Sequence, residues 1–381
     1  MRIGIDARFY GTVGKGLGRY VSELIRQLEL VDRENEYFVF LRETNWGEYT
    51  PRNPNFHKVL AEFAWYGLAE QLIYPFWLRR FRLDLMHFTH FNVPWLYRRP
   101  FVVTIHDLIL LSHPTPRATT LGPLLFRAKY FFYRLIIRSA IARAVTIITV
   151  SRYTQDQIEQ VFPFAKYKTI AVTYEACGSA FSAAVRTEAR PAAPPPGLTR
   201  PFLLYVGNAY PHKNLERLLR AFADFRRRGH GSHHLILVGA QDYFYDRLQL
   251  EARKQKIAEN IVFFGKASDA ELADLYDTAE FYVFPSLCEG FGLPPLEAMC
   301  RGLAVASSKA TCLPEILGDA ALYFDPESET DMAQKLISLA DDPGLRTELA
   351  AKGRTQTKKY DWNSCAAATL RHYQQALAKK Q

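Results

Sequence analysis

Short apolar runs rich in β-branched residues recur along the whole chain, and longer stretches with helical spacing separate them. An unbroken apolar run is typical of a parallel strand that is buried on both faces of its sheet. The alternation therefore predicts an α/β chain whose parallel sheets are covered by helices on both sides. The expected strands are residues 2–6, 37–41, 83–88, 101–105, 145–150 and 169–173 in the first half, and 202–206, 235–238, 261–264, 281–284, 303–306 and 321–324 in the second.

A proline-rich stretch, residues 190–197, separates the two groups of strands. Its rings fix φ and remove backbone donors, so it suits neither a helix interior nor a central strand. We interpret it as a linker between a domain of residues 1–190 and a domain of residues 191–365, with a last helix over residues 366–381 that packs back on the first domain. Two hinged, doubly wound domains typically bind a ligand between the carboxyl ends of their strands.

The net positive charge of the chain comes from its first half. Residues 1–190 contain 25 Lys and Arg against 16 Asp and Glu, whereas residues 191–381 contain 23 of each. A one-sided positive field favours an anionic partner such as a phospholipid surface, a phosphate-bearing substrate or a nucleic acid. An ordinary solvated surface accounts for the same excess equally well.

The sequence predicts neither a membrane span nor a secretion signal. No stretch approaches the roughly 18 uncharged apolar residues of a spanning helix, and residues 1–8 have too short an apolar core for a signal peptide. We therefore expect a cytoplasmic protein. The five cysteines are odd in number and form no C-x-x-C pair, which argues against a zinc knuckle and against a disulfide framework.

Glycines follow the first expected strand at Gly11, Gly14, Gly16 and Gly18, just before a stretch with helical spacing. Glycines at such a place let backbone N–H groups approach a phosphate at a helix N-terminus. The spacing is neither G-x-G-x-x-G nor a P-loop. A tight strand-to-helix turn without a ligand accounts for these glycines equally well.

A more specific motif follows the expected strand 281–284. Two glycines and two prolines in residues 290–295 predict a helix start whose N–H groups lie at the carboxyl end of that strand, which suits an anion. Glu289 and Glu297, eight positions apart, flank this helix start. Carboxylates accept hydrogen bonds from vicinal hydroxyls, so the pair suits two sugars on either side of a diphosphate. Without the glycines, a helix N-terminal charge and a solvated loop residue would explain the two glutamates.

These features together resemble the retaining nucleotide-sugar glycosyltransferases of the GT-B fold, glycosyltransferase family 4, over nearly the whole chain. In detail the chain is most similar to bacterial mannosyltransferases of O-antigen and exopolysaccharide assembly. The resemblance implies two doubly wound, Rossmann-like domains that face each other across a cleft. It is carried by residues 2–8, 16–20, 104–108, 150–151, 205–208 and 211–214, and by the E-x7-E block 289–297 with 313–315 after it.

The resemblance also implies roles for individual residues. The catalytic set is His106, which touches the transferred sugar, Lys213, which neutralises the donor diphosphate, and Glu289, which holds the sugar hydroxyls together with the backbone amides after it. Glu297 takes the ribose hydroxyls, and Gly16 approaches the diphosphate from the first domain. The donor-binding set is completed by Asn208, His212, Gly290, Phe291, Gly292 and Leu293.

The same family often carries arginine where this chain has Asn208 and His212, so its diphosphate chemistry would depend more heavily on Lys213. Breaking an anomeric C–O bond leaves negative charge on the departing nucleoside diphosphate, which demands aimed positive groups. The chain contains no D-x-D string, and we expect neither a metal nor a cofactor. GDP-mannose is the expected donor, with a UDP-sugar as the alternative. For Asp107, beside His106, capping of the following turn is favoured over a role as a base.

The expected acceptor is a glycan or a polyprenyl-diphosphate-linked glycan of cell-surface polysaccharide synthesis. The segment 126–138 places Arg127, Arg134 and Arg138 near one helical face. An amphipathic helix packed on the sheet is the favoured interpretation of this pattern. The alternative is binding at the inner face of the cytoplasmic membrane, through residues near 117–143.

Other classes account for part of the sequence. A dinucleotide-dependent oxidoreductase also uses doubly wound domains, but a G-x-G-x-x-G motif and an acidic residue closing the second strand are not clear. A nucleic-acid-binding protein would explain the basic half, although the basic residues are dispersed and no zinc or RNA-binding signature is present. His87 and His90 follow a strand at an odd spacing that points them apart, so we expect no metal there.

Overall fold

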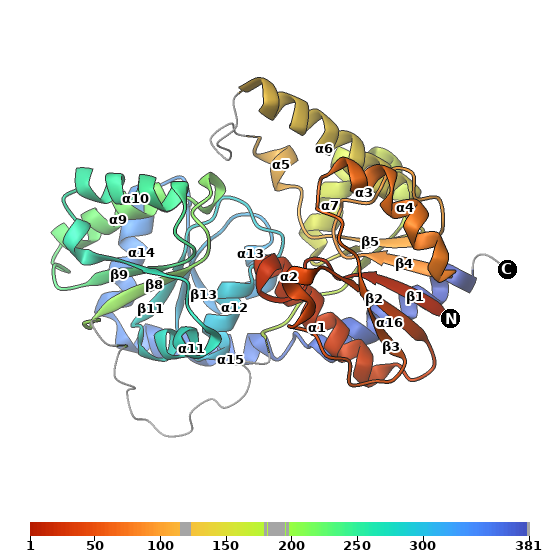
Figure 1. The fold of residues 1–381 in the computed structure, drawn as a ribbon. Coiled ribbons are helices and arrows are strands. Elements are labelled where there is room, and N and C mark those ends of the chain that lie inside the picture. Colours follow the sequence, from red (N-terminus) through yellow and green to blue (C-terminus); the bar gives the residue numbers. More distant parts are fainter. Residues whose placement is uncertain (115–122, 179–180, 182–194, 196–197, 379–381) are drawn as a thin grey trace. The chain divides into compact units, whose positions relative to one another are not determined.

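The computed structural model describes residues 1–114, 123–178, 181, 195 and 198–378. The chain divides into two compact units: unit 1 is Met1–Glu175 with Asp361–Gln381, and unit 2 is Ala176–Tyr360. The division lies at 175/176, fifteen positions before the 190/191 boundary that we expected, and most of the proline-rich stretch lies outside the described residues. Each unit is a parallel sheet covered by helices (Figure 1).

Unit 1 is built on a seven-stranded parallel sheet with the order β3-β2-β1-β4-β5-β6-β7. Ile5 of β1 pairs with Val39 of β2 on one side and with His87 of β4 on the other. The six expected strands are confirmed within about two residues at each end. Their bounds, with those of β3, are β1 Arg2–Asp6, β2 Glu36–Leu41, β3 Phe56–Leu60, β4 Leu85–Phe88, β5 Phe101–Ile105, β6 Thr146–Thr149 and β7 Thr169–Val172.

The sequence did not predict β3, which is the edge strand of this sheet. Only Phe56 of its five residues is buried, and the polar His57 and Lys58 follow it. An edge strand needs no second apolar face, so it lacks the unbroken apolar run of its neighbours.

Helices cover the sheet of unit 1. The terminal helix α16 packs on α1, where the rings of Tyr20 and Trp362 lie 6.1 Å apart. A second apolar cluster joins Phe40, Met86 and Phe88 of the strands to Tyr74 and Ile137 of helices α4 and α6. The helical elements are η1 Gly11–Gly14, α1 Lys15–Val31, α2 Glu43–Trp46, α3 Leu68–Leu72, α4 Tyr74–Trp77, η2 Leu78–Phe81, α5 Ile109–Ser112, α6 Pro123–Arg143, α7 Arg152–Val161, η4 Pro163–Tyr167 and α16 Trp362–Ala378.

Unit 2 repeats the plan with a six-stranded parallel sheet in the order β10-β9-β8-β11-β12-β13. The strands are β8 Phe202–Val206, β9 His234–Val238, β10 Ile261–Gly265, β11 Phe281–Phe284, β12 Val305–Ser308 and β13 Ala321–Phe324. The helical elements are η5 Pro211–Lys213, α9 Leu215–Arg227, α10 Tyr243–Lys254, η6 Ala258–Asn260, α11 Asp269–Thr278, α12 Leu293–Cys300, α13 Leu313–Leu317, α14 Glu329–Asp341 and α15 Pro343–Thr357. All six expected strands are present, with β12 two residues later than predicted.

The strand orders place a topological switch point in each sheet. In unit 1 the chain runs outward from β1 in one direction and from β4 in the other, and in unit 2 it does so from β8 and β11. The loops that leave these paired strands diverge, which opens a crevice at the carboxyl edge of an open parallel sheet. Ligand-binding residues are therefore expected after β1, β4, β8 and β11. Within the described chain, no helix is long and apolar enough to cross a membrane.

Candidate functional site

The two loops at the switch point of unit 2 are joined by an ion pair. Lys213, at the end of η5 after β8, places Nζ 2.6 Å from Oε1 of Glu289 in the loop after β11. The backbone N–H of Leu287 donates to the carbonyl of His212 over 2.7 Å, which ties the same two loops together. The Lys213 and Glu289 side chains are only 14% and 10% exposed. Topology thus brings together two predicted catalytic residues that are 76 positions apart.

The backbone around Glu289 is held by residues that follow β12. The N–H of Glu289 donates to Oγ1 of Thr311 over 3.1 Å. The thiol of Cys312 lies 3.3 Å from the carbonyl oxygens of both Glu289 and Phe291. Burial raises the pKa of Cys312 well above its ordinary value, so the thiol stays protonated and can donate. Sequence reasoning missed both supports, because no local pattern links them to a loop more than twenty positions earlier.

The helix α12 begins directly after this loop. Gly292 caps it with a left-handed backbone at φ +97°, and a Cβ atom there would lie 2.9 Å from Cδ2 of Leu313. The prolines in the first turn fit positions where no N–H needs an intrahelical partner. Gly290, Phe291 and Leu293 thus lie where the sequence placed them, at the start of a helix beside the carboxyl end of β11.

Glu297 lies further along α12, where it is 2% exposed. Its Oε2 atom accepts a hydrogen bond from the hydroxyl of Tyr276 on α11 over 3.2 Å. A carboxylate can accept hydrogen bonds from more than one donor. Tyr276 is a second residue that the sequence did not single out.

Asn208 and His212 belong to the loop after β8. Asn208 is held within its own loop, since its carbonyl accepts from the Tyr205 hydroxyl over 2.8 Å and its Oδ1 accepts from the Tyr210 N–H over 3.3 Å. The ring of His212 lies 6.0 Å from that of Tyr210. The Lys213 side chain reaches the loop after β11, and Nδ2 of Asn214 donates to the carbonyl oxygen of Pro285 just after that strand over 3.0 Å.

His106 stands in unit 1, directly after β5. Its Nδ1 lies 3.2 Å from Oε1 of Glu175, and its Nε2 lies 3.1 Å from the carbonyl oxygen of Thr89. The ring of Tyr20 packs edge-on at 4.7 Å. Polar partners on both nitrogens fix the plane and direction of the imidazole. The partner Glu175, 69 positions away, had no signal in the sequence.

The glycines after β1 serve two different purposes. The structure forms η1 over Gly11–Gly14 and begins α1 at Lys15, so Gly16 and Gly18 lie inside a helix and not in a loop. A Cβ atom would lie 2.0 Å from the Phe9 carbonyl oxygen at Gly14 and 2.0 Å from the Gly11 carbonyl oxygen at Gly18. At Gly16 a Cβ atom would meet nothing within 4 Å. Packing therefore requires two of the glycines and leaves the space beside Gly16 open.

The other polar candidates of unit 1 have structural partners. His87 is buried between the Tyr373 hydroxyl at 2.6 Å and Oγ1 of Thr104 at 2.8 Å, and burial lowers its pKa to about 3. His90 contacts a separate partner, Oδ1 of Asn92, at 2.9 Å. The N–H of Ile109 donates to Oδ1 of Asp107 over 2.9 Å, the turn cap that we expected. Among the residues described here, no group of three or more His, Cys, Asp or Glu is placed to hold a metal ion.

A buried charge network at the switch point of unit 1 escaped the sequence analysis. Arg8, fully buried after β1, donates to both oxygens of Asp6 and to Oε1 of Glu70. Burial alone would lower the pKa of Arg8, but its acidic partners raise it, so the guanidinium is fully charged. Oε1 of Glu70 also accepts from Nδ2 of Asn92 over 2.7 Å. These partners come from distant segments of the chain, so no local motif predicts their contact.

Two family models match this chain, and each falls on one half of it. "Glycosyltransferase Family 4" matches residues 14–174, and "Glycosyl transferases group 1" matches residues 187–356. Two parallel α/β units with these matches define a glycosyltransferase of the GT-B fold. The comparisons thus support a glycosyltransferase that is similar to those of family 4.

Curated relatives extend the match over nearly the whole chain. The O-antigen chain mannosyltransferase B of Escherichia coli is 29% identical over 374 residues, which cover 94% of this chain and 95% of the relative. The O-antigen chain mannosyltransferase RfbU of Salmonella typhimurium is 24% identical over 311 residues, covering 80% of this chain and 77% of the relative. The chain is thus an enzyme that transfers glycosyl groups in polysaccharide synthesis.

Solved structures share the fold at low identity. WaaG, a glycosyltransferase involved in lipopolysaccharide biosynthesis, aligns with a TM-score of 0.74 at 16% identity, over 97% of this chain and 99% of the other. The sucrose-phosphate synthase of Thermosynechococcus elongatus aligns with a TM-score of 0.73 at 16% identity, over the full length of both chains. Anabaena HepE, solved in complex with UDP and glucose, aligns with a TM-score of 0.69 at 16% identity, over 98% and 99% of the two chains.

Proposed function

We propose that this chain is a retaining mannosyltransferase that moves the sugar of GDP-mannose to a glycan or to a polyprenyl-diphosphate-linked glycan. The observation that carries the proposal is the Lys213–Glu289 pair at the switch point of unit 2. This pair joins a cation suited to a diphosphate with a carboxylate suited to sugar hydroxyls. The names of the O-antigen mannosyltransferase relatives support mannose as the sugar.

Binding of the donor is proposed to exchange the partners of this pair. Lys213 leaves the carboxylate for the diphosphate, and Glu289 then accepts hydrogen bonds from the sugar. The two side chains are largely removed from water, so the lysine charge acts on the departing diphosphate with little screening. The amides at residues 290–293 lie beside the same start of α12, where the helix dipole favours negative charge. No metal is required in this scheme.

Glu297 is proposed to hold the ribose of the nucleotide. The Tyr276 hydroxyl donates to Oε2 and helps to fix the carboxylate, a group that suits vicinal hydroxyls as an acceptor. In unit 1, His106 is proposed to touch the transferred sugar with a ring that Glu175 and the Thr89 carbonyl hold in place. The open space beside Gly16 is proposed for the diphosphate.

The donor is tested by its nucleotide. A ligand that binds only the folded state raises the melting temperature, so GDP and UDP are compared by thermal shift, followed by turnover of labelled GDP-mannose and of UDP-glucose. We expect GDP and GDP-mannose to be preferred. The complex of HepE with UDP and glucose supports a UDP-sugar as the second candidate, and a preference for UDP would establish it. No shift and no turnover with either would refute the proposed function.

A peripheral membrane contact is proposed through α6, close to a lipid-linked acceptor. The helix packs on the sheet through buried positions such as Tyr133 and Ile137, as the amphipathic interpretation predicted. Its other side exposes Phe131 and Phe132, at 57% and 58% exposure. Exposed aromatic and basic side chains on one helix are typical of interfacial binding. The exposed basic residues are Arg127, Lys129, Arg134 and Arg138. Residues 117–122 of the expected segment lie outside the described residues.

Co-sedimentation with liposomes tests this contact. Wild-type protein should bind anionic liposomes more than neutral ones, and high salt should weaken the binding because basic side chains act through a screened field. Phe131→Ser with Phe132→Ser should reduce the bound fraction, whereas Val161→Ser, which changes a 46% exposed apolar residue on α7, should not. Equal partitioning to both lipids, or none to either, would refute membrane contact and favour a soluble acceptor.

A further inference from the structure

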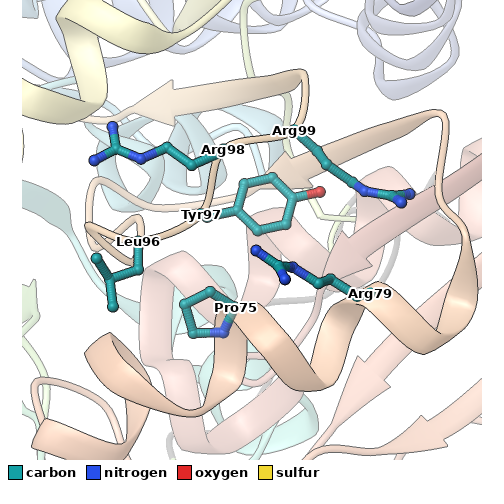
Figure 2. A pocket seen from close by; sticks show the side chains of 6 residues that line it. All are labelled: Pro75, Arg79, Leu96, Tyr97, Arg98 and Arg99. Carbon is teal, nitrogen blue, oxygen red and sulfur yellow. The ribbon is translucent and has the colours of Figure 1, made fainter.

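A basic pocket lies in unit 1, away from the residues described above. Its volume is about 310 Å³, and its lining side chains come from α4, η2 and the loop before β5. Figure 2 shows the Tyr97 ring among them, with the Arg98 and Arg99 side chains extending to opposite sides of it. Three of them are arginines and one is a tyrosine. The lining residues are Pro75, Arg79, Leu96, Tyr97, Arg98 and Arg99.

The pocket lies at the amino edge of the sheet. Arg79 belongs to η2, which precedes β4, and Arg98 and Arg99 directly precede β5, which begins at Phe101. His106 follows the other end of β5. A five-residue strand spans roughly 17 Å, so the pocket and the predicted catalytic histidine stand at opposite ends of that strand. None of the lining residues is one of the predicted catalytic or donor-binding residues.

Among the residues that the structure describes, the arginines of the pocket, Arg79, Arg98 and Arg99, form no ion pair with a carboxylate. Arg79 lies over the Phe76 ring at 4.6 Å, and Arg99 donates to the Leu83 carbonyl over 3.3 Å. Positive charge gathered without compensation attracts anions.

A buried tyrosine hydroxyl completes the pocket. Tyr97 is 3% exposed, its ring packs edge-on against Phe88 and Phe101, and within the described chain its hydroxyl has no hydrogen-bond partner. Burial raises the pKa of Tyr97, an effect that Arg99 partly offsets, so the hydroxyl stays protonated and can donate. A buried hydroxyl without a partner is costly, and a bound acceptor would remove that cost.

The loop that carries these groups is fixed in place. Arg143, at the end of α6, donates to the carbonyl oxygens of Pro94, Trp95 and Tyr97. The N–H of Trp95 donates to Oε1 of Gln71 over 2.9 Å. Burial lowers the pKa of Arg143, and the nearby charge of Arg98 lowers it further. A loop held in this way loses little entropy when a ligand binds.

We propose that this pocket binds a phosphate group. Guanidinium forks match phosphate oxygens in pairs, and the Tyr97 hydroxyl supplies a further, neutral donor. Pro75 and Leu96 give the pocket an apolar wall, against which an ester arm of the phosphate can lie. The phosphate is either free in solution, as phosphate or diphosphate, or part of the headgroup of an anionic phospholipid. This site is independent of the donor chemistry in unit 2.

The test uses the full chain and three variants. Arg98→Gln with Arg99→Gln removes two guanidinium groups, and Tyr97→Phe removes only the hydroxyl. The control, Arg253→Gln with Arg371→Gln, deletes the same charge at two exposed positions elsewhere. Tyr97→Phe should keep or raise the melting temperature, because it deletes a buried hydroxyl without a partner, and it should nevertheless weaken anion binding.

Two arms distinguish the sources of the phosphate. In the first, inorganic phosphate and diphosphate are titrated by calorimetry at low salt. In the second, vesicles of phosphatidylglycerol and of phosphatidylcholine are co-sedimented with each protein. A roughly tenfold weaker affinity of the arginine variant for phosphate or diphosphate supports a site for a free phosphate. The same loss seen only with phosphatidylglycerol vesicles supports a site for a phospholipid headgroup. If both arms show the arginine variant and Tyr97→Phe binding as the control does, the proposal is wrong.

Discussion

The two switch points of this protein have the same topology and different contents. In unit 1 the guanidinium of Arg8 is fully buried and shared by Asp6 and Glu70. In unit 2 the ammonium of Lys213 has a carboxylate partner in Glu289, and both side chains retain some exposure. A cation that is surrounded by several acids stabilises loops, whereas a cation near the surface can exchange its partner for a ligand. The strand order places a cation at each switch point, and the number of acidic partners in the surrounding loops determines whether that cation stabilises the fold or binds a ligand.

The largest expected effect is on the stability of unit 1. Arg8→Ala leaves Asp6 and Glu70 buried without compensation, which should cost about 3–5 kcal/mol of unfolding free energy. All five tryptophans belong to unit 1, so their fluorescence during urea unfolding reports on this unit. Arg42→Ala, which breaks a more exposed ion pair with Glu62, should cost about 1 kcal/mol or less. Equal losses for the two variants would contradict the comparison.

Lys213→Ala should act on turnover instead of stability. Removing one group that stabilises charge in a transition state costs about a hundredfold to a thousandfold in kcat. The melting temperature should change by no more than a few degrees. Lys309→Ala, which removes an exposed lysine paired with Asp325, is the matched control and should leave turnover unchanged. Steady-state kinetics with GDP-mannose and a melting curve measure both properties, and a turnover like that of the control would show that Lys213 has been misassigned.

Replacing each of the two glutamates of the E-x7-E block should change a different kinetic constant. Glu289→Gln should lower kcat by about tenfold to a hundredfold, because a sugar contact strengthens in the transition state. Glu297→Gln should mainly raise KM for the donor, since the ribose contact is the same in ground and transition states. Both replacements keep the side-chain shape. Wild-type kcat in Glu289→Gln would refute its catalytic role.

Replacing the two glycines of α1 by alanine should have smaller and opposite effects on the stability of unit 1. Gly18→Ala places a Cβ atom 2.0 Å from the Gly11 carbonyl oxygen and should destabilise unit 1 by about 1–3 kcal/mol. Gly16→Ala meets no atom and lies in a helix, so unit 1 should be as stable as wild type or slightly more stable. The same variant should raise KM for the donor if the diphosphate uses that space. Tryptophan fluorescence and donor kinetics check the two parts separately.

Chelation should have no effect at all. The proposed scheme uses Lys213 and backbone amides for the leaving diphosphate, so turnover after dialysis against EDTA should equal that of the untreated enzyme. Added magnesium or manganese should not increase it. A loss of turnover that returns with a divalent cation would replace this part of the scheme.

The sequence predicted the strands and much of the site for identifiable physical reasons. Strands buried on both faces produce unbroken apolar runs, and the glycine–proline start of α12 leaves a local pattern beside Glu289. The edge strand β3 leaves no such pattern because one side of it meets solvent. The glycine stretch resembled a phosphate-binding loop in the sequence, yet the structure begins α1 at Lys15. Gly14 and Gly18 are needed there because carbonyl oxygens lie close to both.

The sequence alone did not predict which distant residues form hydrogen bonds with each other. Glu175 lies against His106, Tyr276 against Glu297, and Thr311 against the Glu289 backbone, and each pair joins separate loops or helices. Such pairs depend on strand order, which no local motif encodes. The pocket around Tyr97 escaped for the same reason, because its arginines come from two segments that the sheet brings together.

The exchange of partners at Lys213 is the central claim, and calorimetry of GDP and GDP-mannose tests it most directly. Lys213→Ala should weaken the binding of both ligands. Glu289→Gln removes the competitor for Lys213, so it should bind GDP more tightly than wild type while losing the preference for GDP-mannose over GDP. Opposite signs in the two variants would support the exchange. Wild-type affinity for both ligands in both variants would contradict it.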